Sequence, residues 1–74
     1  MDNVVAIEPS EIIYTLLGVR ADGVASVVDM VPAESLAAVR RFAKALLREH
    51  QSCSLVEVWR DGTLVEQLAR SAAP

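Results

Sequence analysis

The dipeptide Asp-Gly occurs twice in this chain of 74 residues, and each time it separates two apolar runs. Asp22 and Gly23 lie between "EIIYTLLGVR" and "VASVVDMV", while Asp61 and Gly62 lie between "SLVEVWR" and "TLVEQLA". Asp-Gly between apolar runs is among the strongest local signals for a β-hairpin. The sequence therefore predicts two hairpins, one in each half of the chain.

The segment between the hairpins has the periodicity of an amphipathic helix. Its apolar residues form one stripe at helical spacing, made of Leu36, Val39, Phe42, Ala43, Leu46 and Leu47. Pro32 suits the first helical position, and a carboxylate in the first turn, at Glu34, interacts favourably with the helix dipole. We therefore predict a helix over residues 33–50. Its opposite side is basic and carries Arg40, Arg41, Lys44 and Arg48.

The order of elements is then strand, strand, helix, strand, strand, with the last two strands over residues 52–59 and 63–69. We predict a single α+β domain over residues 11–70, with a ββαββ order. In it, one helix packs on one face of a four-stranded antiparallel sheet. Residues 1–10 are expected to form an N-terminal arm or a short edge strand, and residues 71–74 a frayed tail.

A second interpretation of the first strand stays open. The stretch "PSEIIYTLLG" also fits a short helix, with Ser10 as its N-cap and Gly18 just beyond its C-terminus. The β-branched and aromatic residues 12–15 favour the strand.

The phrases "YTLLGVRADGVASVV" and "LVEVWRDGTLVEQL", on either side of the helix, resemble small uncharacterised bacterial proteins built as hairpin–helix–hairpin. The C-terminal hairpin of those proteins often contains "VEVW", then a turn and a short apolar strand. The likeness covers residues 12–68. It implies the ββαββ fold, and it supplies neither an activity nor functional residues.

The length of the second loop decides whether two carboxylates meet. A two-residue loop would set Glu57 directly opposite Glu66, and like charges facing each other destabilise a strand pair. A three-residue loop of residues 60–62 separates them, so we expect this loop, with Glu66 needing an exposed rim or an arginine. The predicted pairs are Trp59 with Thr63, Val58 with Leu64 and Glu57 with Val65. The predicted apolar face of this hairpin carries Val56, Val58, Leu64 and Leu68.

The same loop in the first hairpin would pair Arg20 with Val24 and leave both faces of the hairpin apolar. One face would carry Ile12, Tyr14, Leu16, Val28 and Met30. The other would carry Ile13, Leu17, Val19, Val27 and Val31. One helix covers only one face of such a sheet, so the other face needs a cover. Either the N-terminal segment folds over it or a second copy of the chain does.

So short a chain lies near the lower size limit for a self-sufficient core. A single cysteine, Cys53, excludes an intramolecular disulfide, and the Cys and His residues are too few for a zinc site within one chain. We therefore expect a homodimer. The candidate self-association surface consists of Ile13, Leu17, Val19, Val27 and Trp59. Trp59, beside the turn, is either an anchor of that interface or a residue packed on the sheet.

The basic helix side is the strongest candidate for a surface that binds an anionic partner. Arg41, Lys44 and Arg48 recur at i, i+3 and i+7, with Arg40 adjacent. This side is either a solvated helix face or a contact for an acidic protein or for phosphates. A net charge of −3 and an aromatic content of only 4% make nucleic acid the less favoured partner.

His50 and Cys53 have the spacing of two metal ligands, and on paper they also form a nucleophile and its base. Structural zinc needs four ligands, and a catalytic pair needs a third residue and an oxyanion hole, none of which the sequence indicates. We interpret His50 as the end of the helix and Cys53 as a small apolar strand residue. No catalytic residue, metal or cofactor is predicted.

The sequence contains no apolar run long enough for a membrane span, and its acidic N-terminus does not have the pattern of a signal peptide. We expect a cytoplasmic, bacterial protein with no membrane partner. The expected function is a non-enzymatic interaction or regulatory module that forms a homodimer and binds an unidentified protein. The alternative is a nucleic-acid-associated regulator, and a third class is a ligand or metal site at a dimer interface.

Overall fold

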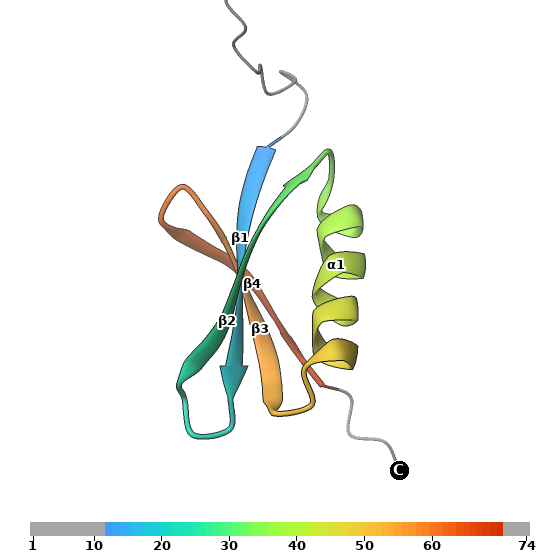
Figure 1. Ribbon diagram of the computed structural model, residues 1–74. Helices are drawn as coiled ribbons and strands as arrows, with labels where there is room; N and C mark the ends of the chain where they lie inside the picture. Colours follow the sequence, from blue (N-terminus) through green and yellow to red (C-terminus); the bar gives the residue numbers. More distant parts are fainter. Residues whose placement is uncertain (1–11, 71–74) are drawn as a thin grey trace, which may run out of the picture.

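The computed structural model describes residues 12–70 and has the ββαββ order in a single antiparallel sheet (Figure 1). The elements are β1 (Ile12–Arg20), β2 (Ala25–Ala33), α1 (Leu36–Glu49), β3 (Cys53–Arg60) and β4 (Thr63–Ala69). The strand order is β2-β1-β3-β4, and α1 packs against one face of the sheet. The predicted α+β fold is confirmed. The arm predicted at residues 1–10 and the frayed tail predicted at residues 71–74 lie outside the described residues.

Helix α1 begins later than predicted. The side chain of Ser35 accepts a hydrogen bond from the backbone N–H of Ala38 at 3.2 Å, which makes Ser35 the N-cap. A serine N-cap satisfies one of the free N–H groups of the first helical turn, and this determines the start of the helix in place of the upstream Pro32. Pro32 is instead part of β2, and Glu34 precedes the cap, so neither has the predicted role. At the other end His50 is the C-cap and donates its N–H to the carbonyl of Leu46.

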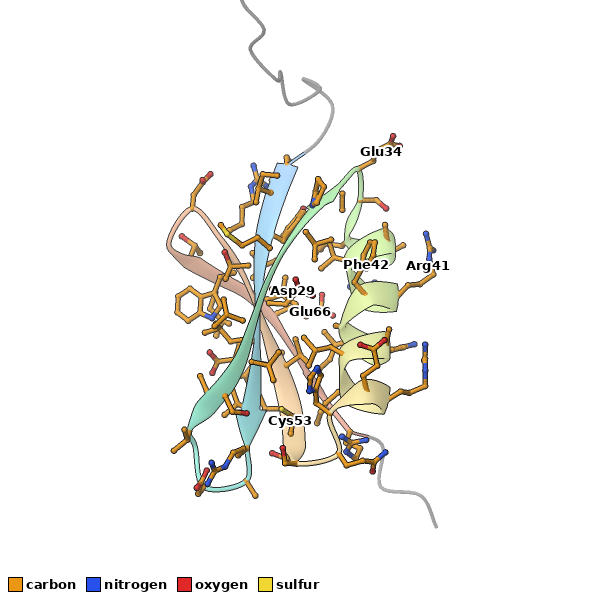
Figure 2. The ribbon with its side chains drawn as sticks, viewed as in Figure 1. Asp29, Glu34, Arg41, Phe42, Cys53 and Glu66 are labelled. Carbon is orange, nitrogen blue, oxygen red and sulfur yellow. The ribbon has the colours of Figure 1, made fainter. Side chains whose placement is uncertain are left out.

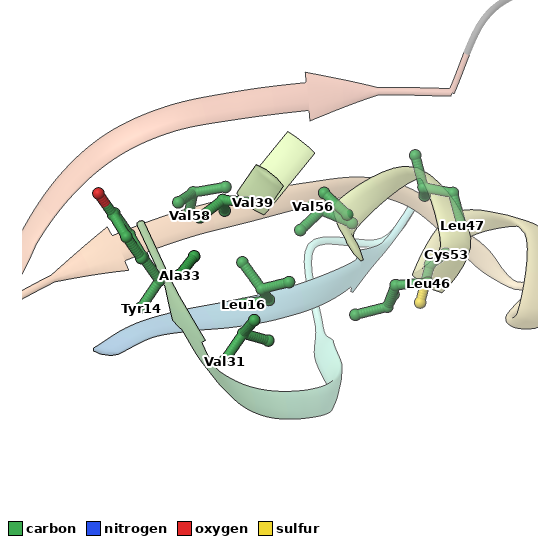
Figure 3. Packing of buried hydrophobic residues seen from close by; sticks show 11 residues of the cluster. Tyr14, Leu16, Val31, Ala33, Val39, Leu46, Leu47, Cys53, Val56 and Val58 are labelled. Carbon is green, nitrogen blue, oxygen red and sulfur yellow. The ribbon is translucent and has the colours of Figure 1, made fainter. Parts of the chain in front are cut away.

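The core lies between α1 and the sheet (Figure 3). In β1 the burial alternates, with Tyr14, Leu16 and Gly18 buried, so this segment is a strand and the short helix considered for it does not form over residues 12–18. The buried cluster contains Tyr14, Leu16, Val31, Ala33, Val39, Ala43, Leu46, Leu47, Cys53, Val56 and Val58. Phe42, expected in the apolar stripe, lies at the flank of α1 and is 49% exposed.

The first hairpin has the predicted three-residue loop. Arg20 donates its N–H to the carbonyl of Val24 at 2.9 Å, and Gly23 has the left-handed backbone (φ 87°) that this loop requires. One step further the register shifts, because Val19 faces Ala25 while Gly18 faces Val27. The residue left over is Ser26, a β-bulge.

This bulge exchanges the two faces of β2. The side chains of β1 face as predicted, with Leu16 toward α1 and Leu17 away from it. In β2, however, Val27 and Val31 turn toward α1 while Val28 and Met30 turn away, the reverse of the prediction. A shift of one residue reverses the direction of every side chain that follows in the strand.

The second hairpin has a two-residue loop, so the three-residue loop predicted for it is wrong. Asp61 (φ 51°) and Gly62 (φ 77°) both have positive φ, as a type I′ turn requires, and Arg60 pairs with Thr63. The repulsion between Glu57 and Glu66 is avoided in another way: Val65 forms a bulge in β4.

The bulge at Val65 determines which side chains of β4 meet β3. Trp59 pairs with Leu64, but Val58 then pairs with Glu66 and Glu57 with Gln67. The two glutamates therefore lie on opposite faces, as expected, although the predicted pairs are wrong. Val56, Val58 and Leu68 face α1, whereas Leu64 turns to the other side.

Helix α1 packs closely on β1 at Gly18. A Cβ atom at this position would lie 2.9 Å from Cys53 Sγ, 2.9 Å from Leu46 Cδ2 and 3.1 Å from Val27 Cβ. Real Cβ atoms do not approach other heavy atoms to 2.9 Å. Glycine is needed here for space, since its backbone has no unusual φ.

Replacing Gly18→Ala should therefore lower the free energy of unfolding by about 1–3 kcal/mol, as overpacked cores do. Urea denaturation followed by circular dichroism measures this directly. In a Cys53→Ala background, where the Sγ atom is gone, the same substitution should cost less. A change below about 0.5 kcal/mol in the wild-type background would contradict the close approach.

Candidate functional site

The face of the sheet turned away from α1 is apolar, and no element within residues 12–70 covers it. We call this surface the outer face; it consists of Ile13, Leu17, Val19, Val28, Met30, Leu55, Trp59 and Leu64. All four strands contribute to it. Its members on the two edge strands are well exposed: 64% for Val28, 66% for Met30 and 42% for Leu64.

Four of the five residues predicted as a self-association surface lie on the outer face: Ile13, Leu17, Val19 and Trp59. The fifth, Val27, does not, because the bulge at Ser26 turns it toward α1, where it packs against the core. Val28 and Met30 take its place. Leu55 and Leu64 also belong to this surface and were missed. The direction of Leu64 depends on the bulge at Val65, whereas strand alternation from Trp59 would have placed Leu55 on this face.

Trp59 packs on the sheet rather than projecting from the turn. Its indole N–H donates a hydrogen bond to Glu57 Oε1 at 3.0 Å, and both side chains are half-buried. Glu57 therefore places a carboxylate among apolar neighbours, and the indole satisfies one of its oxygens. Any partner that covers the outer face has to accommodate this charge.

Arg40 is not free to bind an external anion. Its Nε and Nη2 atoms donate to Glu66 Oε2 and Oε1 at 2.8 and 2.9 Å, a two-point contact between α1 and β4. This provides the arginine that Glu66 was expected to need. Hydrogen bonding by Arg40, aided by its positive charge, lowers the pKa of Glu66 below its ordinary value, and the same contact raises the pKa of Arg40.

The other three basic residues of the predicted stripe remain exposed. Arg41, Lys44 and Arg48 form no ion pair with another residue of the described range 12–70. Arg41 points away from the sheet (Figure 2). Lys44 and Arg48 instead border a groove between α1 and β4.

This groove, called here the β4 groove, has a volume of about 350 Å³. It is lined by Lys44, Leu47, Arg48, Leu68, Ala69 and Arg70. Arg70 also holds the end of α1, because its guanidinium donates to the carbonyls of Leu47 (2.7 Å), His50 (3.0 Å) and Cys53 (2.8 Å). The bond to Leu47 satisfies a carbonyl group at the end of the helix. The bond to His50 adds to the one from the N–H of Cys53, and the bond to Cys53 connects the same guanidinium to the start of β3. The sequence assigned no role to Arg70.

His50 and Cys53 do not form a site together. His50 is exposed and ends the helix, as interpreted, while Cys53 is 1% exposed and belongs to the core. Across residues 12–70, His, Cys, Asp and Glu side chains nowhere gather in a group of three that could hold a metal ion.

Helix α1, the one helix within the described range, is too short to cross a membrane. Comparison of the chain with protein-family models, curated proteins and solved structures gives no match. Function therefore has to be inferred from the surfaces of the molecule.

The ion pair between Arg40 and Glu66 predicts a pH-dependent contribution to stability. The pKa of Glu66 is lower in the folded state, so the stabilisation is present above the unfolded pKa and is lost as the pH falls through the folded one. Glu66→Gln should therefore destabilise the protein at pH 7 and make little difference below about pH 3. Urea denaturation at a series of pH values measures both variants.

The control for this pair is Arg40→Gln, which removes the other partner. In that background Glu66→Gln should have nearly the same effect at both pH values. An equal loss of stability at pH 7 and at pH 3 in the otherwise unchanged chain would show that the pair contributes nothing.

Proposed function

We propose that this protein is a non-enzymatic interaction or regulatory module of the bacterial cytoplasm and that it self-associates through the outer face. One observation supports this above all others: an apolar surface built from all four strands has no cover within residues 12–70. Continuous apolar patches of this kind mark protein interfaces in soluble proteins. The occupant we propose is a second copy of the chain.

The size of the outer face suits a small dimer. Four strands about 4.8 Å apart, each contributing about seven residues, span roughly 20 by 25 Å, or on the order of 500 Å² per subunit. Two such faces, with their side-chain relief, approach the roughly 1,200 Å² of the smaller specific interfaces. Two sheets stacked face to face would interdigitate these side chains as in a β-sandwich.

The small core adds a reason for self-association. A chain of 74 residues buries too little apolar surface for a wide margin of stability, and it has only one cysteine, so no internal disulfide can help. Burial of a second apolar layer between two copies would supply the missing stabilisation, because any partner that binds only the folded state stabilises it.

Met30→Asp should convert the proposed dimer into a monomer. The side chain is 66% exposed in the single chain, so an aspartate there is tolerated by the fold but places a charge in the proposed interface. Sedimentation velocity at micromolar concentration measures the state. Phe42→Asp is the matched control, because Phe42 is 49% exposed on α1, outside the outer face, and its replacement should leave the dimer intact.

A second variant tests the same interface in the opposite direction. Glu57→Gln keeps an oxygen that can accept the hydrogen bond from Trp59 but removes the charge, so it should strengthen self-association severalfold. A wild-type chain that stays monomeric at micromolar concentration, with no loss of stability on dilution, would refute the proposal.

The second candidate function is a nucleic-acid-associated regulator that uses the basic side of α1. The exposure of Arg41, Lys44 and Arg48, without an acidic partner in the described part of the chain, favours it. The negative net charge of the chain opposes it. Because Arg40 forms an ion pair with Glu66, it is not part of the proposed contact with nucleic acid.

If this second function holds, the chain should bind a DNA or RNA duplex at low salt. Three phosphate contacts would give a slope of roughly −3 when the logarithm of affinity is plotted against that of salt concentration. Arg41→Gln should reduce the slope by about one, whereas Arg40→Gln should leave it unchanged. Fluorescence anisotropy of a labelled duplex provides the measurement, and absence of binding at low salt removes this candidate.

A further inference from the structure

The β4 groove combines positive charge with an apolar floor. Three of its lining residues are cations, Lys44, Arg48 and Arg70, and none of the lining residues within 12–70 is a carboxylate. Leu47, Leu68 and Ala69 supply the apolar part of the lining. The nearest acidic residue of the same face along β4 is Glu66, and its charge is already matched by Arg40. The groove therefore suits a ligand that carries negative charge together with apolar groups.

The groove lies beside a strand edge that pairs with no other strand of the described residues. β4 is the last strand of the sheet, and the N–H of Arg70 donates to the carbonyl of Ser54 at 2.9 Å. In an antiparallel pair the backbone groups of successive residues point alternately toward the neighbouring strand and away from it. Gln67 and Ala69, both exposed, therefore turn their N–H and C=O groups away from β3. Such groups are a template for an added strand.

The opposite edge of the sheet is less suited to strand addition. β2 contains Pro32, which has no N–H, and a proline in an edge strand discourages further pairing. β4 contains no proline. Of the two edges, β4 is the better suited to accept a strand, over the residues that follow the bulge at Val65.

Charge excludes a second copy of this chain as the occupant of the β4 edge. Two β4 strands paired about a two-fold axis would bring Lys44 and Arg48 of each copy near the same residues of the other. Juxtaposed like charges of this kind disfavour an interface. The occupant has to be a different, acidic chain, and stacking of two outer faces would leave this edge free for it.

We infer that the β4 edge and the β4 groove together bind an extended acidic peptide segment of another protein, which adds to the sheet as a fifth strand. Its backbone pairs with Gln67 and Ala69. Its side chains alternate, with carboxylates directed toward Lys44 and Arg48 and apolar groups extending the outer face beyond β4. Backbone pairing supplies the affinity, and the cations select the acidic sequence.

The test uses a fluorescein-labelled octapeptide of alternating valine and glutamate, added to the full chain and followed by fluorescence anisotropy. We expect saturable binding at about 50 mM salt that weakens at least about fivefold at about 500 mM, because the contact is partly ionic. A lysine-for-glutamate version of the probe should not bind. A version N-methylated on alternate amides should also fail, because its backbone can no longer pair with the edge.

Charge reversal locates the contact on the protein. Lys44→Glu and Arg48→Glu should each weaken probe binding about tenfold, an effect of the size expected for like charges brought together. Arg60→Glu is the matched control: it makes the same change of charge at the far end of the same hairpin and should alter binding less than about twofold. The monomeric variant Met30→Asp should bind the probe like wild type, which separates this site from self-association.

Any of the following outcomes would overturn the inference. The first is no binding of the glutamate probe at low salt. The second is unchanged binding of the N-methylated probe. Another is an equal loss with Arg60→Glu and Lys44→Glu, which would show attraction to net charge alone. The last is displacement of the probe by an unlabelled DNA duplex, with a loss from Arg41→Glu as large as that from Lys44→Glu, which would assign these cations to nucleic acid.

Discussion

The close approach of α1 to the middle of the sheet at Gly18 determines which parts of the sheet the helix covers and which it leaves exposed. A helix that lies where even a Cβ atom would collide with Cys53 and Leu46 buries most of the inner face of the two central strands. It covers the edge strands less fully, although Val31 and Ala33 of β2 are buried. The cross-strand row Asp29, Leu16, Val58 and Glu66 illustrates this, because its two central members are buried apolar residues and its two outer members are carboxylates. The face opposite α1 receives no cover from the helix at all.

Three bulges, at Ser26, Ser54 and Val65, adapt the sheet to this single helix. The bulge at Ser26 turns Val27 and Val31 toward α1. The bulge at Ser54 brings Cys53 into the core, and the hydroxyl of Ser54 donates a hydrogen bond to the carbonyl of Val19. The bulge at Val65 brings Glu66 to the side of Arg40. Each extra residue thus assigns side chains to the inner or the outer face, which is the general consequence of a one-residue shift in a strand.

The sequence predicted the elements well and their pairing less well, for a physical reason. Asp-Gly turns and a 3.6-residue periodicity are strong local signals, so both hairpins, the helix and the ββαββ order were predictable. Strand β2 has apolar residues on both of its faces, with Val27 and Val31 on one and Val28 and Met30 on the other. Its sequence therefore does not determine the register in which it pairs with β1. The roles of Ser35 and Arg70 depend on backbone groups at the helix ends, which Pro32 and the helical periodicity did not reveal. The bulge at Ser26 was likewise not predictable, so of the five residues predicted as a self-association surface four lie on the outer face and Val27 faces α1.

The two surfaces left by this architecture differ in the kind of partner they admit. The outer face is apolar and nearly uncharged, so a copy of itself complements it, and Glu57 is the one feature that resists such pairing among its described neighbours. The β4 groove is cationic, so a copy of itself is repelled and an acidic chain is attracted. Stacking of two sheets leaves their edges open, because it uses side chains, whereas strand addition uses backbone groups. Under the two proposals made above, a chain with a single small core pairs with itself on one surface and selects a different partner on the other.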